Sequence, residues 1–221
     1  MKLISKKLSA FIIIFSGSIL VFSQDPYTGK PYNNQPQLIP GKIECEFFDL
    51  GGENVAYHDT DSVNNGSGKL NPVNGTYLNE FRIKDGVDIS YTKTNGIDNN
   101  PYNIVEPKME QLYVGWTVPG EWINYSVNIT KSGTYQLGIM YTCNGNGVIG
   151  LSLDNNDVTT VLNVITTHND LDTVAWRQWH HWNKIDSLTS IKLEAGNHIL
   201  TLKTLENGNI NYDYLEFKEV K

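Results

Sequence analysis

The chain alternates apolar and polar residues with a period of two over most of its length, and this pattern constrains the fold more than any other feature. In the segment at 121–129 the apolar side chains fall on one face of an extended chain: Ile123, Tyr125, Val127 and Ile129. The segment at 133–143 repeats the pattern with Tyr135, Leu137, Ile139, Tyr141 and Cys143. Successive side chains of a strand point to opposite faces, so the pattern predicts strands with one buried face.

Turn signals separate these segments at short intervals, among them Pro119-Gly120, Ser132-Gly133 and Ala195-Gly196. Short strands with regularly spaced turns are typical of a sandwich or a jelly roll. We therefore predict an all-β fold, a two-sheet β-sandwich (jelly roll) of about ten strands. The segment at 60–110 is rich in Asn, Gly, Asp and Pro, and only 87–91 within it is strand-like. We expect this segment to form long loops over one end of the sandwich.

The N-terminus carries a basic stretch followed by an apolar run at 8–22 and the small residue Ser23. This order is typical of a signal peptide, and the apolar run is short for a membrane span. We predict cleavage near Ser23, which places the mature chain outside the cytoplasm: secreted, periplasmic or at the cell surface, with no membrane span. The alternative is an uncleaved N-terminal anchor, which leaves the domain in the same compartment.

The chain then divides into three parts. We predict a signal peptide at 1–23, a disordered leader at 24–40 that is rich in Pro, Asn and Gln, and a single domain at 41–221. We also expect that domain to stand alone, without an attached catalytic domain.

Charge and cysteine content narrow the possible partners. The net charge is −7 and no cluster of Lys and Arg occurs, so nucleic acid is not an expected partner. The two cysteines, Cys45 and Cys143, fall in the buried phase of their segments. A disulfide and two buried thiols are both open.

Tryptophans concentrate in two turn-like segments. Trp116 precedes a Pro-Gly turn, and the stretch AWRQWHHW holds Trp176, Trp179 and Trp182. A sugar ring has an apolar C–H face edged by hydroxyls, so an exposed indole beside amides suits pyranose binding. For any single tryptophan the core is the more common place, whereas for the set as a whole we expect at least one to be exposed.

Three carboxylates are candidates for a cation site. Glu44 and Glu46 alternate with Cys45 on what reads as the first strand, and Asp213 lies in the last. First and last strands of a sandwich often pair, which would bring the three acids together. Hard oxygen ligands favour Ca²⁺ over Zn²⁺. The alternative is that these are surface carboxylates. The histidines lack zinc-ligand spacing, and no GxSxG serine motif occurs.

The order of motifs is similar to a known family. The chain contains, in sequence, IECEFFDLGGENVAYHDTD, DGVDISY, YVGWTVPGEWINYSVNI, SGTYQLGIMY, AWRQW and INYDYLEF. From about residue 43 to 217 it resembles a family 6 carbohydrate-binding module, the kind found beside secreted β-glucanases and agarases. The resemblance implies a β-jelly roll with a structural calcium and a sugar site in the loops at one edge of the sandwich. Some members of the family also have a second cleft on a concave sheet face.

The resemblance also implies roles for individual residues. Trp116 and Trp176 would sandwich a sugar ring, and Asn211 would hydrogen-bond it. Glu53, in the GGE segment, corresponds more loosely to a residue that bonds sugar in some members. The calcium ligands would be Glu44, Glu46 and Asp213. Trp179 would then belong to the core.

Two departures from the family pattern concern the site. The chain has DTVAW where the family usually has TGGW, so Val174 and Ala175 replace glycines before Trp176. The segment at 92–110 is long, and we expect it to form one wall of the site. Cys45 also stands where the family usually has alanine.

From these residues we expect a non-catalytic module that binds a polysaccharide or the end of its chain by aromatic stacking. A β-glucan or an agar-type glycan is the expected ligand, and separate glycoside hydrolases are possible partners. Two alternatives remain: a glycoside hydrolase or lyase built on a β-sandwich, and a surface adhesion domain that uses the same loops.

Overall fold

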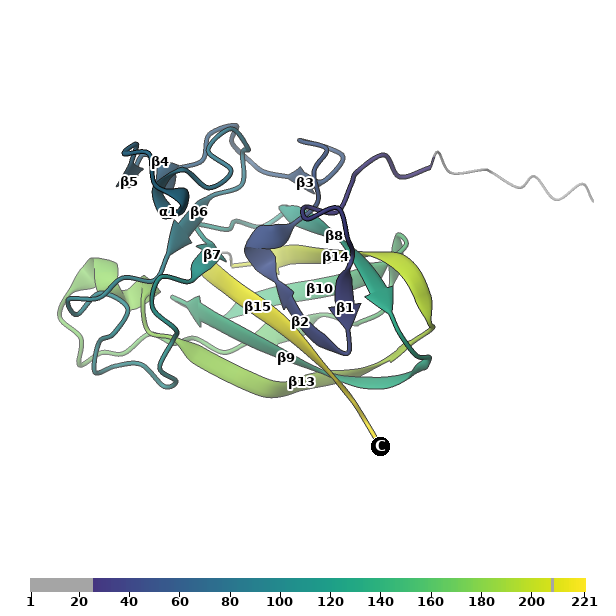
Figure 1. The fold of residues 1–221 in the computed structure, drawn as a ribbon. Helices are drawn as coiled ribbons and strands as arrows, with labels where there is room; N and C mark the ends of the chain where they lie inside the picture. The colour runs from purple at the N-terminus through teal and green to yellow at the C-terminus, as the bar shows by residue number, and fades with distance from the viewer. Residues whose placement is uncertain (1–25, 208) are drawn as a thin grey trace, which may run out of the picture.

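Two β-sheets pack face to face in the computed structural model, which describes residues 26–207 and 209–221 (Figure 1). The first sheet consists of β1 (Gln37–Ile39), β3 (Tyr57–His58), β8 (Trp122–Ile129), β10 (Gly147–Leu153), β11 (Asn156–Asp157), β12 (Leu162–Val164) and β14 (Gly196–Glu206). Its main order is β1-β8-β14-β10-β11, with β3 on β8 and β12 on β10. The predicted signal peptide at 1–23 lies outside the described residues.

The second sheet contains three of the candidate site residues, Glu44, Asn211 and Asp213. It consists of β2 (Gly41–Glu44), β6 (Ile89–Tyr91), β7 (Leu112–Val114), β9 (Gly133–Cys143), β13 (Asn183–Leu193) and β15 (Ile210–Glu219). Its order is β13-β9-β15-β7-β6, and β2 pairs with β15. The predicted two-sheet β-sandwich is therefore confirmed. So is the pairing of the first and last strands of the predicted domain, because Glu44 lies opposite Tyr214.

The core lies between the sheets and contains the apolar faces that the alternation predicted. Tyr125 and Val127 from β8 are fully buried, as are Leu137 and Ile139 from β9. Both cysteines are buried and free, so the described residues hold two thiols and no disulfide. No helix in the described part of the chain is long and apolar enough to cross a membrane.

Loops and short elements cover one end of the sandwich, as expected for residues 60–110. They include β4 (Ser67–Gly68), β5 (Asn71–Pro72) and the short helix α1 (Tyr77–Glu80), which Figure 1 shows together above the sheets. Two 3₁₀ turns complete the fold, η1 (Cys45–Phe47) and η2 (Ala175–Trp179). The C-terminal end of β15 lies at the opposite end of the sandwich from these loops (Figure 1).

The predicted disordered leader at 24–40 does not match the structure of residues 26–40. Strand β1 runs parallel to β8, with Leu38 opposite Asn128. The ring of Tyr32 stacks on Phe47 with centroids 5.4 Å apart and planes 5° from parallel. Its Pro, Asn and Gln content indicated disorder, but aromatic stacking and the free edge of β8 hold the segment in place.

The expectation that Glu44, Cys45 and Glu46 alternate along one strand is wrong. Strand β2 ends at Glu44, and the chain then turns into η1. The pairing of β2 with β15 stops at Tyr214, next to a register shift in β15 between Tyr212 and Tyr214. Without a ladder partner beyond this point the chain turns, and it buries the side chains of both Cys45 and Glu46.

Candidate functional site

A groove of about 580 Å³ opens where four connecting segments of the sandwich meet. The end of β7 and the residues after it contribute Tyr113, Trp116 and Val118, and η2 and its C-cap contribute Trp176, Trp179 and His180. The remaining lining residues are Asn209, Asn211 and Leu70. The structure thus brings together Trp116, Trp176 and Asn211, three of the predicted sugar-binding residues.

Trp116 presents its indole from a strained turn. It follows β7 after Gly115, and 42% of its surface is exposed. Its φ angle is +51°, in the left-handed region that side chains larger than glycine rarely occupy. A hydrogen bond from its backbone N–H to Oδ1 of Asn211, at 3.3 Å, helps to hold it there. Strain at such a residue is common at binding sites.

Trp176 is the more exposed of the two, at 54%, and projects from η2. An ion pair fixes this turn: Nε and Nη2 of Arg177 lie 2.7 and 2.8 Å from the two oxygens of the buried Asp172. Hydrogen bonds from Arg177 hold the pKa of Asp172 well below its usual range. The buried His181 lies 2.8 Å from the same carboxylate. These contacts of Asp172 hold η2 in a position that leaves Trp176 exposed.

The prediction that Trp179 belongs to the core is wrong. Its side chain is half-buried and lines the groove. The reason is the local helix type, because a 3₁₀ turn has three residues per turn and places residues i and i+3 on one side. Trp176 and Trp179 are related in this way. The fully buried tryptophan of the segment is Trp182.

Asn211 lines the groove and connects the segments that carry Trp116 and Trp179. Its side chain is buried, and Nδ2 donates to Oγ1 of Thr142 at 2.9 Å and to the carbonyl of Trp179 at 2.8 Å. Its Oδ1 accepts from the backbone of Trp116. Both amide protons are therefore used within the protein, and one lone pair of Oδ1 is left for a ligand. The predicted hydrogen bond to sugar stays a prediction.

Glu53 does not line the groove. Its Oε1 lies 2.5 Å from Nδ1 of His58, and its Oε2 accepts from the backbone N–H of Asp59 at 3.1 Å. It borders a different depression, together with Asp61 and Lys84. Glu53 precedes β3, which pairs with β8 of the first sheet, whereas the groove is built at the end of the second. The structure therefore gives no support to the predicted sugar-binding role of Glu53.

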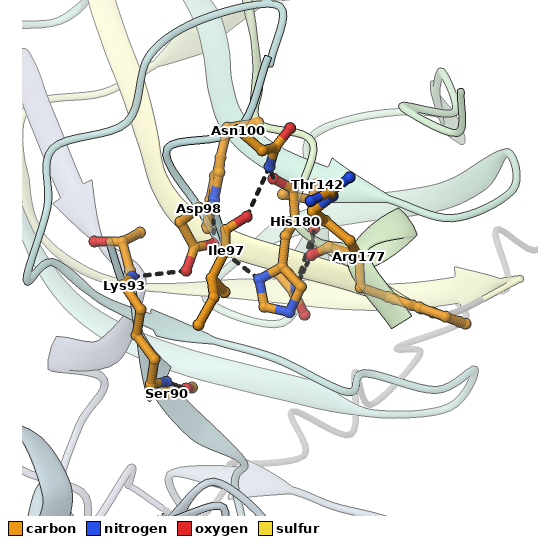
Figure 2. Close-up of polar contacts among 12 residues, drawn as sticks. Ser90, Lys93, Ile97, Asp98, Asn100, Thr142, Arg177 and His180 are labelled. Atoms are coloured by element: carbon orange, nitrogen blue, oxygen red, sulfur yellow. Dashed lines mark hydrogen bonds and ion pairs between the residues drawn. The ribbon is translucent and has the colours of Figure 1, made fainter. Parts of the chain in front are cut away.

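His180 is a groove residue that the sequence analysis considered only as a metal ligand. Its Nδ1 lies 2.9 Å from Oδ1 of the buried Asp98, as Figure 2 shows. Its ring meets that of Trp176 edge to face, with centroids 5.8 Å apart. The predicted wall at 92–110 contributes no lining side chain among the described residues. Instead, Asp98 of this segment contacts Nδ1 of His180.

Two of the three predicted calcium ligands are buried, and the third, Glu44, is half-buried. Glu46 is 1% exposed and Asp213 is 4% exposed. Burial, and then the charge of Glu44, raises the pKa of Asp213 to about 7. Burial is also the main cause of the raised pKa values of Glu44 and Glu46. One oxygen of Glu46 and one of Asp213 have no hydrogen-bond partner within the described residues.

These orphaned oxygens fit a hard divalent cation, because buried carboxylates otherwise need a charged or hydrogen-bonding partner. The fit concerns the type of ligand atom and not the arrangement of the side chains. In the part of the chain that the structure describes, no group of three or more His, Cys, Asp and Glu side chains is arranged to hold a metal ion. Binding would therefore require Glu44, Glu46 and Asp213 to move.

Comparisons with known proteins agree with the β-sandwich fold. The model of a family described as "Carbohydrate binding module (family 6)" matches residues 85–219. A search of curated proteins found no match. Among solved structures, the module CsCBM6-3 from Clostridium stercorarium, in complex with cellobiose, is 11% identical with a TM-score of 0.50. The match covers 84% of this chain and 98% of that chain.

A second similar structure belongs to a larger protein, a glycoside hydrolase family 43 arabinoxylan arabinofuranohydrolase from Bacillus subtilis in complex with cellotetraose. It is 14% identical with a TM-score of 0.51, and the match covers 84% of this chain but 28% of the enzyme. At these identities, both likenesses concern the fold.

Proposed function

The chain belongs to carbohydrate-binding module family 6, and we propose that it binds a neutral polysaccharide, or the end of its chain, by stacking a sugar ring between Trp116 and Trp176. The observation that carries this proposal is the pair of exposed indoles on two walls of one groove. An indole face covers the apolar face of a pyranose, as apolar walls do in other small-molecule sites.

The charge of the groove supports a neutral ligand. None of its described lining residues is Lys, Arg, Asp or Glu. An acidic glycan would need basic groups to replace its lost hydration, and the chain as a whole carries a net charge of −7. A neutral glycan needs only the flat rings and a few hydrogen-bonding groups.

We infer a non-catalytic role from the same residues. Glycoside hydrolysis ordinarily needs two carboxyl groups that flank the scissile bond. The described lining of the groove supplies none, and the acids Glu46 and Asp213 are buried. The module would therefore serve as a binding partner for separate glycoside hydrolases that act on the same polysaccharide.

The weak affinity of such a site favours a polymeric ligand. Each well-placed ring contributes about 1 kcal/mol beyond its buried area, so a single sugar should bind in the micromolar to millimolar range. β-Glucans and agar-type glycans are the first polymers to test. The solved complexes with cellobiose and cellotetraose make cello-oligosaccharides the first short probes.

Native affinity electrophoresis through gels containing soluble polysaccharides tests the site. We expect Trp176→Ala and Trp116→Ala each to weaken retention by roughly tenfold or more, with unchanged folding. The matched control is Trp122→Ala. Trp122 lies in a separate depression on the first sheet, with Asn124 and Thr201. If Trp122→Ala removes retention and Trp176→Ala does not, the sugar site lies on that sheet.

We further propose that Ca²⁺ is held by Glu44, Glu46 and Asp213 together with backbone carbonyls. The ion would neutralise these carboxylates and join η1 to β15.

We also propose that the protein is exported, which the basic and apolar N-terminal residues support. Mass spectrometry of the mature protein, collected from a host that exports it, would show whether cleavage occurs near Ser23.

A further inference from the structure

We propose that His180 determines which sugars the groove accepts: its Nε2 atom accepts a hydrogen bond from a sugar hydroxyl, and Asp98 holds the imidazole in the tautomer that makes this possible. The inference rests on the proposed function and adds to it a polar contact and a selection rule.

The tautomer follows from the partners of Asp98. Its Oδ1 accepts from the indole N–H of Trp182 at 2.7 Å, and its Oδ2 accepts from the backbone N–H of Lys93 at 2.7 Å. Both of these groups can only donate, so both carboxylate oxygens act as acceptors. The proton between Asp98 and His180 therefore lies on Nδ1 of the imidazole. In the neutral ring, Nε2 is then a bare acceptor.

The position of Nε2 points to a ligand. Nδ1 faces the buried carboxylate, and the ring lines the groove with 17% of its side chain exposed. Among the residues that the structure describes, none forms a hydrogen bond with Nε2. Figure 2 shows the ring between Asp98 and the segment that carries Arg177.

The backbone of His180 is held in place before any ligand arrives. Nδ2 of Asn100 donates to the carbonyl of His180 at 2.8 Å, and the backbone N–H of His180 donates to the carbonyl of Arg177 at 2.8 Å. Nη1 of Arg177 reaches the carbonyl of Gly96 at 3.3 Å. These bonds join the segment at 92–110 to η2. A group that is already oriented loses little entropy on binding.

The hydrogen-bonding groups of His180 and Asn211 then determine which sugars the groove selects. Asn211 lies in the same groove with both amide protons used, so its free capacity is also that of an acceptor. Two acceptors in one groove match hydroxyl groups that donate. A carboxylate or sulfate at this place would be repelled by the lone pairs of the two acceptors and by the negative charge of Asp98. The groove should thus favour unsubstituted hydroxyls over uronate or sulfate esters.

His180→Phe is the informative variant, since it keeps a flat ring beside Trp176 and removes both nitrogens. His198→Phe is the matched control: His198 also pairs through Nδ1 with an aspartate, Asp154 at 2.6 Å, but lies on β14 outside the groove. Retention is measured on gels containing barley β-glucan, laminarin, xylan, agarose or alginate.

We expect wild-type protein to be retained by at least one of the neutral polymers and not by alginate. His180→Phe should bind that polymer about tenfold more weakly, and His198→Phe should bind it as wild type does. If His180→Phe binds as tightly as wild type, or if alginate is the best ligand, the inference is wrong.

Nitrogen-15 spectra of the wild-type imidazoles test the tautomer without any variant. The expected result is a protonated Nδ1 and a bare Nε2 for His180, whose Nε2 signal shifts when the retained glycan is added. A protonated Nε2 in the free protein would overturn the inference. Failure of the proposed function looks different: no neutral polymer would retain the wild type, or Trp116→Ala and Trp176→Ala would leave retention unchanged.

Discussion

Oδ1 of Asn211 accepts a hydrogen bond from the backbone N–H of Trp116 at 3.3 Å, across 95 residues of sequence. The same side chain donates to the carbonyl of Trp179, so one buried amide connects two tryptophan-bearing loops. We therefore expect Asn211 to act on both stability and binding.

Asn211→Ala should lower the free energy of unfolding by about 1–3 kcal/mol, because it leaves buried donors and acceptors without partners. It should weaken glycan retention as well, since the loops lose their connection. Urea denaturation and affinity electrophoresis measure the two effects. The control is Asn128→Ala, which removes an exposed amide pair with Asn197 and should change stability by less than about 0.5 kcal/mol. Unchanged stability in Asn211→Ala would mean that the side chain serves the ligand alone.

The left-handed backbone at Trp116 predicts an unusual order of stabilities. Glycine adopts a positive φ without steric strain, whereas alanine does not. Trp116→Gly should therefore be more stable than Trp116→Ala by about 0.5–1 kcal/mol, although both lose the indole that would contact sugar. Thermal denaturation of the two variants makes the comparison. A more stable alanine variant would show that the turn relaxes once the indole is removed.

The acidic loop beside β3 predicts a pH dependence of stability. Burial, followed by the charge of Glu121, raises the pKa of Asp59 to about 7. Because the pKa is higher in the folded than in the unfolded state, this group's contribution to stability is complete below about pH 4. It is lost as the pH rises through about 7. The melting temperature should therefore fall between pH 5 and pH 8.

Asp59→Asn should flatten that decline, because the amide oxygen can still accept the backbone N–H of Asp61 that Oδ1 accepts now. Melting curves from pH 5 to pH 8 at constant Ca²⁺ concentration provide the test. Asp170, whose side chain is 98% exposed, supplies the control variant Asp170→Asn. If both variants keep the wild-type slope, another group causes the pH dependence.

The buried acids predict a response to calcium. A ligand that binds only the folded state at a hundred times its Kd stabilises that state by about 2.7 kcal/mol. For a domain of this size, that should raise the melting temperature by roughly 5–10 °C relative to a chelator. Glu46→Gln should abolish the response. Glu216→Gln, a control on β15 that affects the ion pairs with Lys184 and Lys218, should keep it. Equal melting temperatures of the wild type with calcium and with chelator would contradict the proposed metal site.

Local pattern predicted the strands well. The apolar alternation at 133–143 coincides with β9, and the alternation at 121–129 contains β8. Period two is a property of the extended chain itself, so it can be read without knowing the partners of a strand. The turn at Glu44 could not be predicted this way, because it depends on where the ladder with β15 stops.

Only those residues of the candidate site that lie in the recognised sequence motifs could be predicted. Trp116 and Trp176 were identified, and the structure places both on one groove. The orientation of Trp179 depends on whether its segment forms a 3₁₀ turn, and the sequence does not show that. The contact of His180 with Asp98 spans 82 residues. Two polar residues so far apart carry no local signal of their pairing.

Strand β15 has one further consequence, which is mechanical. It begins beside the groove with Asn211 and ends near the C-terminus at the opposite end of the sandwich (Figure 1). It is bonded along its length to β9 on one side and, in part, to β2 on the other. Tension between a held glycan and Lys221 would run parallel to this strand, while its hydrogen bonds lie across it. Many bonds would then share the load in shear, so β15 would resist being pulled out of its sheet from that end.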